Sequence, residues 1–433
     1  MNAPIENRRY SSEITAADDG KQVEIAGWVH EKRDLGGLFF LIIRDREGYA
    51  QVTLFKRAVD KALFEQARKV PRESVVVIRG VVKAEPKAPN GYELIPNRLE
   101  VLSEASSILP LDTTGKVGAE LDTRLDARFM DVRTERTKHI FIIRSRMLKL
   151  VRDFLTERGF IEINTPKIVS SATEGGTALF PITYFEREAF LNQSPQLYKQ
   201  MLMASGLDKV YEIAPIFRAE EHDTTKHLNE ATSIDVEVSF VSVEEVMQLL
   251  EELIFSVYSQ IASYPGLSSF SIDFQVPKTP FRRIRYDEAI ELLVEEGEQI
   301  EWGDDLSTSA EHRLGKAIGE LYFITDWPRA IKPFYAQPTE GKETCEAFDL
   351  MHPRMELSSG SQRVHSYELL KENIDAKGLN PASFEYYLRA FQYGMPPHAG
   401  WGLGAERLLM CMLGLENVRE AVLFPRDRRR LVP

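Results

Sequence analysis

Five short apolar segments near the N-terminus restrict the fold of this chain more than any other feature of its sequence. They lie between residues 22 and 102 and read QVEIAGWV, LFFLII, YAQVTLF, SVVVIRGVV and YELIPNRLEVL. All are rich in the β-branched and aromatic residues that favour strands. A helical pattern, VDKALFEQARKV, separates the third segment from the fourth. The five segments therefore predict a small β-barrel with one helix between its third and fourth strands.

This order of elements is that of the OB-fold, a barrel that frequently binds single-stranded nucleic acid. We expect Arg33, Phe40 and Gln51 on the exposed face of its first three strands. An aromatic ring can stack on an unpaired base, while arginine and glutamine can read base edges or hold phosphate. A core position is the alternative for Phe40, because periodicity does not separate a core ring from a surface ring.

We expect a linker and a second, larger domain after the barrel. The barrel domain is assigned to residues 1–102, the linker to 103–133, where no period is sustained, and the second domain to 134–433. In the second domain, strand patterns such as KVYEIAPIFR alternate irregularly with helical patterns such as VEEVMQLLEELIFSVYSQIAS. Strands without a regular βαβ rhythm predict an α+β fold, with a mainly antiparallel sheet flanked by helices.

The composition and the N-terminus argue against several classes of protein. No stretch approaches the ~20 consecutive apolar residues of a membrane helix. The start, MNAPIENRRYSSE, lacks the apolar core of a signal peptide, so we expect a cytoplasmic protein with no membrane partner. Cys345 and Cys411 lie in no CxxC or Cys/His cluster and cannot form a disulfide framework. The formal charge of -12 argues against nucleic-acid binding over the whole surface but allows a local basic face.

The segment FRAEEHDTTKHLNEATSIDVE, residues 217–237, predicts a β-hairpin with a long functional loop. Arg218 ends the alternating run VYEIAPIF, and alternation resumes in ATSIDVEVSF. An arginine fixed at a strand end can hold a phosphate or carboxylate by two parallel hydrogen bonds. Glu220, Lys226 and His227 add polar groups around it. A solvated hairpin tip is the alternative.

Two C-terminal segments carry further candidate residues. In GWGLGAERLLMCM, three glycines allow close backbone approach, and Arg407 lies in the first turn of a helix whose N-terminus favours anions. In CEAFDLMHPRMELSSGSQRVH, Asp349 and Glu356 flank a turn and can hold Mg²⁺ against phosphate oxygens if the two sides pair. Two surface acids are the alternative. Arg363 is a cation suited to a small carboxylate.

Two earlier segments add an acid and a cation. In SATEGGTALF, Glu174 precedes two glycines and predicts a mobile lid that can present an acid to an ammonium group. QSPQLYKQMLM predicts a helix with Gln196 and Lys199 in its first turn. A lysine at that end opposes the helix dipole, so a carboxylate partner is expected.

Together these segments resemble the class II aminoacyl-tRNA synthetases. Phe217-Arg218-x-Glu220 with its long loop, and GLGAER at residues 402–407, look like motifs two and three of that class, and INTPK around Pro166 looks like motif one. The N-terminal OB-fold is similar to that of the subgroup with the aspartyl, asparaginyl and lysyl enzymes. QSPQLYKQ, FDLMHPRMELSSGSQRVH and PPHAGWGLGAER are similar to the aspartyl-tRNA synthetase family in particular. The compact length is similar to the archaeal type of that family, which some bacteria also carry.

The resemblance implies a homodimeric enzyme that activates L-aspartate with ATP and Mg²⁺ and transfers it to tRNA(Asp), with tRNA(Asn) left open as a second acceptor. It implies catalytic roles for Arg218, Arg407 and Glu356. It implies an aspartate pocket of Glu174, Gln196, Lys199, Arg218, Ser359 and Arg363. It implies an ATP site of Arg218, Ala219, Glu220, Lys226, His227, Leu228, Glu356, Gly404, Ala405, Glu406 and Arg407. It implies Mg²⁺ ligation by Glu356 and Ser359 with help from Asp349, anticodon contacts from Arg33, Phe40, Gln51 and Glu93, and tRNA choice near His30 and Pro86.

Two alternatives stay open. An asparaginyl-tRNA synthetase shares nearly all of this architecture, and Lys199 is the discriminating residue. A non-catalytic, synthetase-like RNA-binding paralogue is the other, although retention of Arg218, Arg407 and Glu356 argues against it. One position departs from the family, whose loop commonly reads RHLNE where this chain has Lys226 at the first position. Lysine keeps the charge but loses the planar fork of arginine.

Overall fold

The computed structural model describes residues 7–170, 179–220 and 224–433. The chain separates into two compact units, Met1–Thr134 and Glu135–Pro433. In the described ranges, no helix has both the length and the apolar character needed to cross a membrane.

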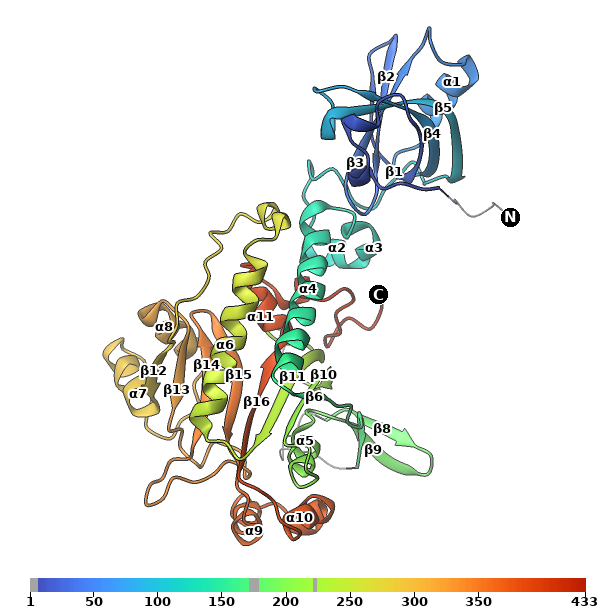
Figure 1. The fold of residues 1–433 in the computed structure, drawn as a ribbon. Helices are drawn as coiled ribbons and strands as arrows, with labels where there is room; N and C mark the ends of the chain where they lie inside the picture. Colours follow the sequence, from blue (N-terminus) through green and yellow to red (C-terminus); the bar gives the residue numbers. More distant parts are fainter. Residues whose placement is uncertain (1–6, 171–178, 221–223) are drawn as a thin grey trace. The chain divides into compact units, whose positions relative to one another are not determined.

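The N-terminal unit is a closed five-stranded barrel with strand order β1-β2-β3-β5-β4 (Figure 1). The strands are β1 (Gln22–Asp34), β2 (Leu38–Arg44), β3 (Tyr49–Phe55), β4 (Val75–Ala84) and β5 (Tyr92–Ser103). Helix α1 (Lys61–Lys69) lies between β3 and β4 in the chain, which confirms the predicted order of an OB-fold. Alternate side chains such as Leu41, Val52 and Leu94 are fully buried and fill the barrel. Short 3₁₀ turns cover Ser11–Glu13, Ala16–Asp18 and Pro89–Gly91.

The segment after the barrel has structure of its own. It contains two short helices, α2 (Leu121–Asp126) and α3 (Arg128–Asp131). Helices this short complete too few turns to show a period in sequence. The buried carboxylate of Glu73 ties the segment to the barrel, because it accepts hydrogen bonds from Thr113 (2.7 Å) and Arg133 (2.9 Å).

The C-terminal unit is built on an eight-stranded sheet in the order β12-β13-β14-β15-β16-β11-β10-β6. Its strands are β6 (Ile161–Glu162), β10 (Lys209–Phe217), β11 (Glu230–Ser239), β12 (Arg282–Arg285), β13 (Tyr322–Thr325), β14 (Ala347–His352), β15 (Met355–Gln362) and β16 (His398–Gly404). The pairs β6/β10 and β12/β13 are parallel and the others antiparallel, which confirms the mainly antiparallel α+β prediction. A small second sheet contains β7 (Ile168–Val169), β8 (Pro181–Tyr184) and β9 (Arg187–Leu191).

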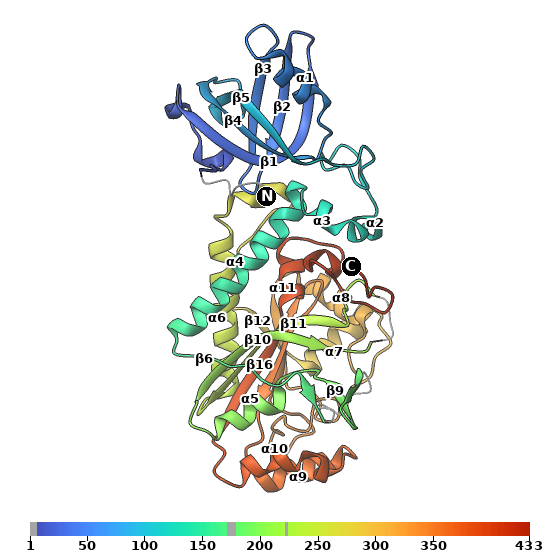
Figure 2. The same cartoon turned by 90° about the vertical axis from the view of Figure 1, so that its right-hand side faces the viewer.

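Helices α4 (Glu135–Glu157) and α6 (Val243–Ile261) lie along one face of the large sheet, as Figures 1 and 2 show from two directions. Other helices are α5 (Gln196–Met203), α7 (Tyr286–Glu295), α8 (Thr308–Ile318), α9 (Tyr367–Ala376), α10 (Glu385–Phe391) and α11 (Ala405–Met412), with 3₁₀ turns at Pro265–Ser269, Pro381–Phe384 and Val418–Ala421. Strand β11 shows how the faces divide, because Ile234, Val236 and Val238 belong to the core that α4 and α6 help to form. The alternating polar residues of β11 therefore point to the opposite face.

The segment FIEINTPK contains a strand that is much shorter than its composition suggests. FIEINTPK pairs as a strand only over Ile161–Glu162. Beyond this point the backbone N–H of Thr165 donates to the carboxylate of Glu212 (2.8 Å) and not to a strand carbonyl. The Glu212 side chain thus takes the place of a strand neighbour just before Pro166, whose backbone has no N–H to donate.

Candidate active site

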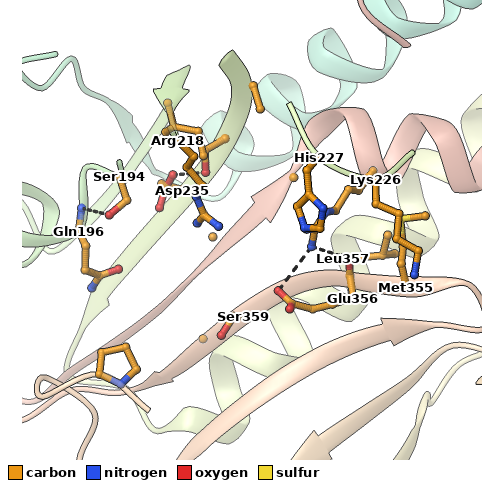
Figure 3. A pocket seen from close by; sticks show the side chains of 18 of the residues that line it. Ser194, Gln196, Arg218, Lys226, His227, Asp235, Met355, Glu356, Leu357 and Ser359 are labelled. Carbon is orange, nitrogen blue, oxygen red and sulfur yellow. Dashed lines mark hydrogen bonds and ion pairs between the residues drawn. The ribbon is translucent and has the colours of Figure 1, made fainter. Parts of the chain in front are cut away.

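A cavity of about 510 Å³ opens on the face of the large sheet away from α4 and α6. Its lining comes from β10, β11, β14, β15 and β16, from α5, α8 and α11, from the loop between β10 and β11, and from residues 332–336. Figure 3 shows Ser194, Gln196, Arg218 and Asp235 at one end, and Lys226, His227 and Glu356 at the other. Ser359 lies between the two groups. The cavity is thus elongated, with a different set of polar groups at each end.

Arg218 stands where the hairpin of β10 and β11 opens into its loop. The strands pair antiparallel from Lys209 opposite Val238 to Phe217 opposite Glu230, which confirms the predicted hairpin. The backbone N–H of Arg218 donates to the carbonyl of Asn229 (2.9 Å), and the Asn229 side chain donates back to the carbonyl of Arg218 (2.7 Å). The backbone is therefore fixed, while the exposed guanidinium lines the cavity.

Four buried charges form the wall at the Arg218 end. Lys199 Nζ lies 3.0 Å from Asp235 Oδ1 and 3.4 Å from Glu237 Oε2. Arg363 Nε lies 2.9 Å from Glu237 Oε1. Burial alone would raise the pKa of Glu237, but Arg363 and Lys199 outweigh it and hold that pKa below its usual value. The formal charges of the four groups sum to zero.

Glycines of β16 make room for this acidic wall. A Cβ atom on Gly400 would lie 2.2 Å from Glu237 Oε2, and one on Gly402 would lie 3.2 Å from Asp235 Oδ1. The glycine run predicts close backbone approach without specifying the neighbouring group. At Gly400 and Gly402 it lets backbone approach the carboxylates of the neighbouring strand β11.

At the other end of the cavity, the guanidinium of Arg407 contacts Glu356 of strand β15. Arg407 Nη1 donates to the carbonyl of Glu356 (3.2 Å) and lies 3.9 Å from Glu356 Oε1. His227 accompanies it from the hairpin loop, with Nδ1 2.7 Å from Thr224 Oγ1. Burial, together with the nearby cations, lowers the pKa of His227 even though Glu220 opposes the shift.

Asp349 and Glu356 place carboxylate oxygens on the adjacent strands β14 and β15. Asp349 lies opposite Ser359 in the register of β14 and β15. Its Oδ2 accepts from Lys332 Nζ (2.6 Å), while Oδ1 is buried without a hydrogen-bond partner among the described residues. Burial raises the pKa of Asp349. An all-oxygen set with one buried unsatisfied oxygen fits Mg²⁺, which takes few protein ligands and completes its shell with water and phosphate.

Most of the site residues that the sequence predicts in the C-terminal unit lie around one cavity. The lining contains Gln196, Arg218, Glu220, Lys226, His227, Leu228, Glu356, Ser359, Arg363, Gly404, Glu406 and Arg407. Lys199, Ala219, Asp349 and Ala405 are outside that lining, and Lys199 and Asp349 stand directly behind it through their contacts. Glu174 lies outside the described residues.

Sequence reasoning missed four charged residues around the cavity. They are Asp235, Glu237, Glu311 and Lys332. Asp235 and Glu237 had a readable signal, since they alternate with apolar residues in ATSIDVEVSF and must share one face of the strand. Glu311 and Lys332 had none, because each reads locally as an ordinary surface charge.

The outer face of the barrel gathers the residues predicted to contact nucleic acid. Phe40 lies opposite Arg33 on β1 and opposite Thr53 on β3. Glu93 on β5 is buried, accepting from Thr53 Oγ1 (2.6 Å) and Lys83 Nζ (2.7 Å). Gln51 lies on the same face of β3 as Thr53, two residues away.

His30 and Pro86 occupy different environments in the N-terminal unit. His30 is buried, with Nδ1 3.0 Å from Arg44 Nη1, and burial lowers its pKa. Pro86 is exposed in the turn after β4. Their role in tRNA choice stays a prediction.

Comparison with known proteins gives matches over the whole chain. Residues 23–102 match the family described as the OB-fold nucleic acid binding domain. The "Aspartate--tRNA(Asp/Asn) ligase" of Archaeoglobus fulgidus is 59% identical, covering 98% of this chain and 100% of its own length. The protein of the same name from Methanothermobacter thermautotrophicus is 56% identical, covering 99% of each chain.

Solved structures of similar fold come from both the aspartyl and the asparaginyl enzymes. Asparaginyl-tRNA synthetase from Pyrococcus horikoshii, complexed with asparaginyl-adenylate, has a TM-score of 0.94 at 35% identity, covering 99% of this chain and 100% of its own. Aspartyl tRNA synthetase from Entamoeba histolytica has a TM-score of 0.88 at 32% identity, covering 98% and 92%.

The cavity and the comparisons agree on the family. The arginines and acids that look like motifs two and three of the class line one cavity beside a mainly antiparallel sheet. Residues 120–428 match the family described as tRNA synthetases class II (D, K and N). On this match, and on the identity with full-length relatives, the chain belongs to the class II tRNA synthetases of the D, K and N group.

Proposed function

We propose that this chain is an aspartate–tRNA ligase, which forms aspartyl-adenylate from L-aspartate and ATP and transfers the aspartyl group to tRNA(Asp). The observation that carries the choice of amino acid is the wall of Lys199, Asp235, Glu237 and Arg363. Its balance of charge suits a substrate with one ammonium group and a carboxylate side chain. The names of the close relatives support the same choice.

In this proposal, the ammonium and the side-chain carboxylate of the bound amino acid each meet an opposite charge of the wall. Asp235 lines the cavity and is the acid suited to the substrate ammonium. Once Asp235 is so engaged, Lys199 and Arg363 share Glu237, which leaves one positive charge for the substrate side chain. An aspartate carboxylate neutralises that charge, whereas the neutral amide of asparagine does not. A site built this way rejects the amide because its cation stays uncompensated.

Arg218 and Arg407 serve the nucleotide in this proposal. An oxygen of the α-carboxylate of aspartate attacks the α-phosphorus in line, the bond from the α-phosphorus to the oxygen bridging to the β-phosphate breaks, and pyrophosphate leaves with the electron pair. Arg218 is placed at the amino-acid end, where it stabilises the charge on the α-phosphate, and Arg407 lies at the other end for the phosphate tail. The 3′-hydroxyl of the tRNA then takes the aspartyl group and AMP leaves.

Glu356, Ser359 and Asp349 would hold Mg²⁺ that arrives with ATP. When bound, the ion would supply positive charge to neutralise the phosphate oxygens. Glu356, Ser359 and Asp349 would position the phosphate tail of ATP. Lys332 holds Asp349 by a hydrogen bond to its Oδ2.

The test of this function is aspartate-dependent exchange of pyrophosphate into ATP. We expect exchange with L-aspartate at least 10³-fold more efficient than with L-asparagine, judged by kcat/KM. Exchange that ran with asparagine in preference would identify an asparaginyl enzyme. No exchange with either amino acid would favour the alternative that the chain is a non-catalytic RNA-binding paralogue.

The OB-fold barrel would read the tRNA anticodon, with Phe40 as the stacking platform. Replacing Phe40 by alanine should raise KM for tRNA(Asp) about 10-fold to 100-fold, since a base–aromatic stack contributes ~1–3 kcal/mol. Pyrophosphate exchange needs no tRNA and should stay at the parent rate. Aminoacylation and exchange measured on the same preparation check this, and equal losses in both would contradict an anticodon role.

Aspartylation of tRNA(Asn) is a second activity to test, because the relatives' names include that tRNA. Side-by-side aspartylation of tRNA(Asp) and tRNA(Asn) transcripts settles it. A homodimeric state and a cytoplasmic location are further parts of the proposal, supported by the sequence resemblance. Sedimentation of the full chain tests the first.

A further inference from the structure

An acid from helix α8 reaches into the nucleotide end of the cavity. Glu311 lies in the first turn of α8, and its side chain is 19% exposed. It lines the cavity together with Lys226, Glu356 and Arg407. The proposed reaction gives it no role. A carboxylate beside a triphosphate site is unfavourable unless it holds a cation.

The cation nearest to Glu311 is Lys226. Glu311 Oε2 and Lys226 Nζ are 3.7 Å apart. The ammonium nitrogen of Lys226 is buried and makes no hydrogen bond to any described group. Glu311 is therefore the charge that holds this ammonium in the cavity. Burial and the negative charge of Glu356 raise the pKa of Glu311 to about 7, while Lys226 and Arg407 oppose that shift.

A lysine at position 226 needs an anionic neighbour to hold its ammonium group in one place. Its ammonium is a point charge at the end of four rotatable carbons, whereas arginine presents a rigid planar fork. An arginine can find a phosphate by two parallel hydrogen bonds, but a free lysine loses rotamer entropy when it is placed. An ion pair formed beforehand removes part of that cost.

We propose that Glu311 is a positioning residue, which orients Lys226 toward the phosphate tail of ATP. The inference rests on the proposed function, since it requires a nucleotide at this end of the cavity. Glu311 holds the ammonium in place before ATP binds, and the ammonium then contacts the phosphate while it stays near Glu311. Glu311 acts through Lys226 and has no direct contact with the reacting atoms.

The test is a set of single and double variants assayed by pyrophosphate exchange at pH 8, where the Glu311 carboxylate is ionised. Glu311→Gln keeps the shape and removes the charge, and we expect KM for ATP to rise about fivefold to tenfold. KM for aspartate and kcat should change less than about twofold, because the amino-acid end is untouched. Glu311→Asp keeps the charge and should recover at least part of the ATP affinity. Glu320→Gln, an exposed acid just beyond the end of α8, is the matched control and should match the parent.

The double variant decides whether Glu311 acts through Lys226. In a Lys226→Ala background, Glu311→Gln should raise KM for ATP by less than about twofold. If turnover of the Lys226→Ala variants is too slow to measure, the dissociation constant of ATP from titration calorimetry gives the same double-mutant comparison. Equal effects of Glu311→Gln in both backgrounds would overturn the proposal, and a raised Mg²⁺ requirement in both would identify Glu311 as a metal ligand instead. A parent chain without exchange activity would refute the proposed function, whereas an active parent with an unaffected Glu311→Gln variant refutes only this inference.

Discussion

Replacing Arg218 by alanine should lower kcat for aspartate-dependent pyrophosphate exchange by about 10³-fold. The guanidinium faces the cavity where negative charge would develop on the α-phosphate, and one such preorganised donor contributes about 10²–10³-fold, more when it carries charge. Arg218→Lys should lie between the parent and the alanine variant, because it keeps the charge and loses the fork.

The fold should survive this change, since the Arg218 side chain is exposed and its backbone is held by Asn229. Arg282, an exposed arginine on β12, offers a control with the same change of charge. Arg282→Ala should keep the parent rate. An Arg218→Ala chain that formed adenylate at the parent rate would remove Arg218 from the mechanism.

Replacing Glu237 by glutamine should destabilise the protein by about 3–5 kcal/mol. The side chain is fully buried and is the shared anion between Lys199 and Arg363. The amide has the same shape but leaves the two buried cations with Asp235 as their remaining anion in the wall. The measurement is urea-induced unfolding followed by tryptophan fluorescence, with the midpoint expected to fall.

Two companion variants separate this electrostatic cause from a general effect of substitution on β11. Glu230→Gln changes an exposed acid of the same strand and should stay within about 0.5 kcal/mol of the parent. Lys199→Met in the Glu237→Gln chain removes one of the two cations and should recover part of the loss. If the double variant is less stable than Glu237→Gln alone, the buried charges do not explain the effect.

Local patterns predicted the elements with strong periods and the residues at their ends. The five barrel strands, the 217–237 hairpin and the helix that follows GWGLG all follow from alternation, helical period and glycine placement. Arg218 and Arg407 could be singled out because strand ends and helix starts are where anions are bound. Glu356 could be singled out because it flanks a turn together with Asp349 and can hold Mg²⁺.

The rest of the site depends on contacts between distant parts of the chain. Glu311 reaches Lys226 only because the sheet brings α8 beside the hairpin loop, and no local signal marks a helical acid for this. A carboxylate partner is expected for Lys199 from the sequence, but its identity depends on the contact of α5 with β11. Strand β6 is short because the side chain of Glu212 takes the hydrogen bond that a strand neighbour would otherwise accept.

The glycines of β16 limit how the enzyme's specificity can change. A Cβ atom on Gly400 would lie 2.2 Å from both Glu237 Oε2 and the backbone oxygen of Val236, and one on Gly360 of β15 would lie 2.4 Å from the ring of Phe348. Positions 360 and 400 are therefore closed to new side chains. Variants selected for a different amino acid should carry their changes in the polar residues of β11, α5 and the β15 end, and keep the glycines. In a directed-evolution library, positions 360 and 400 can be left undiversified at little loss of useful sequence space.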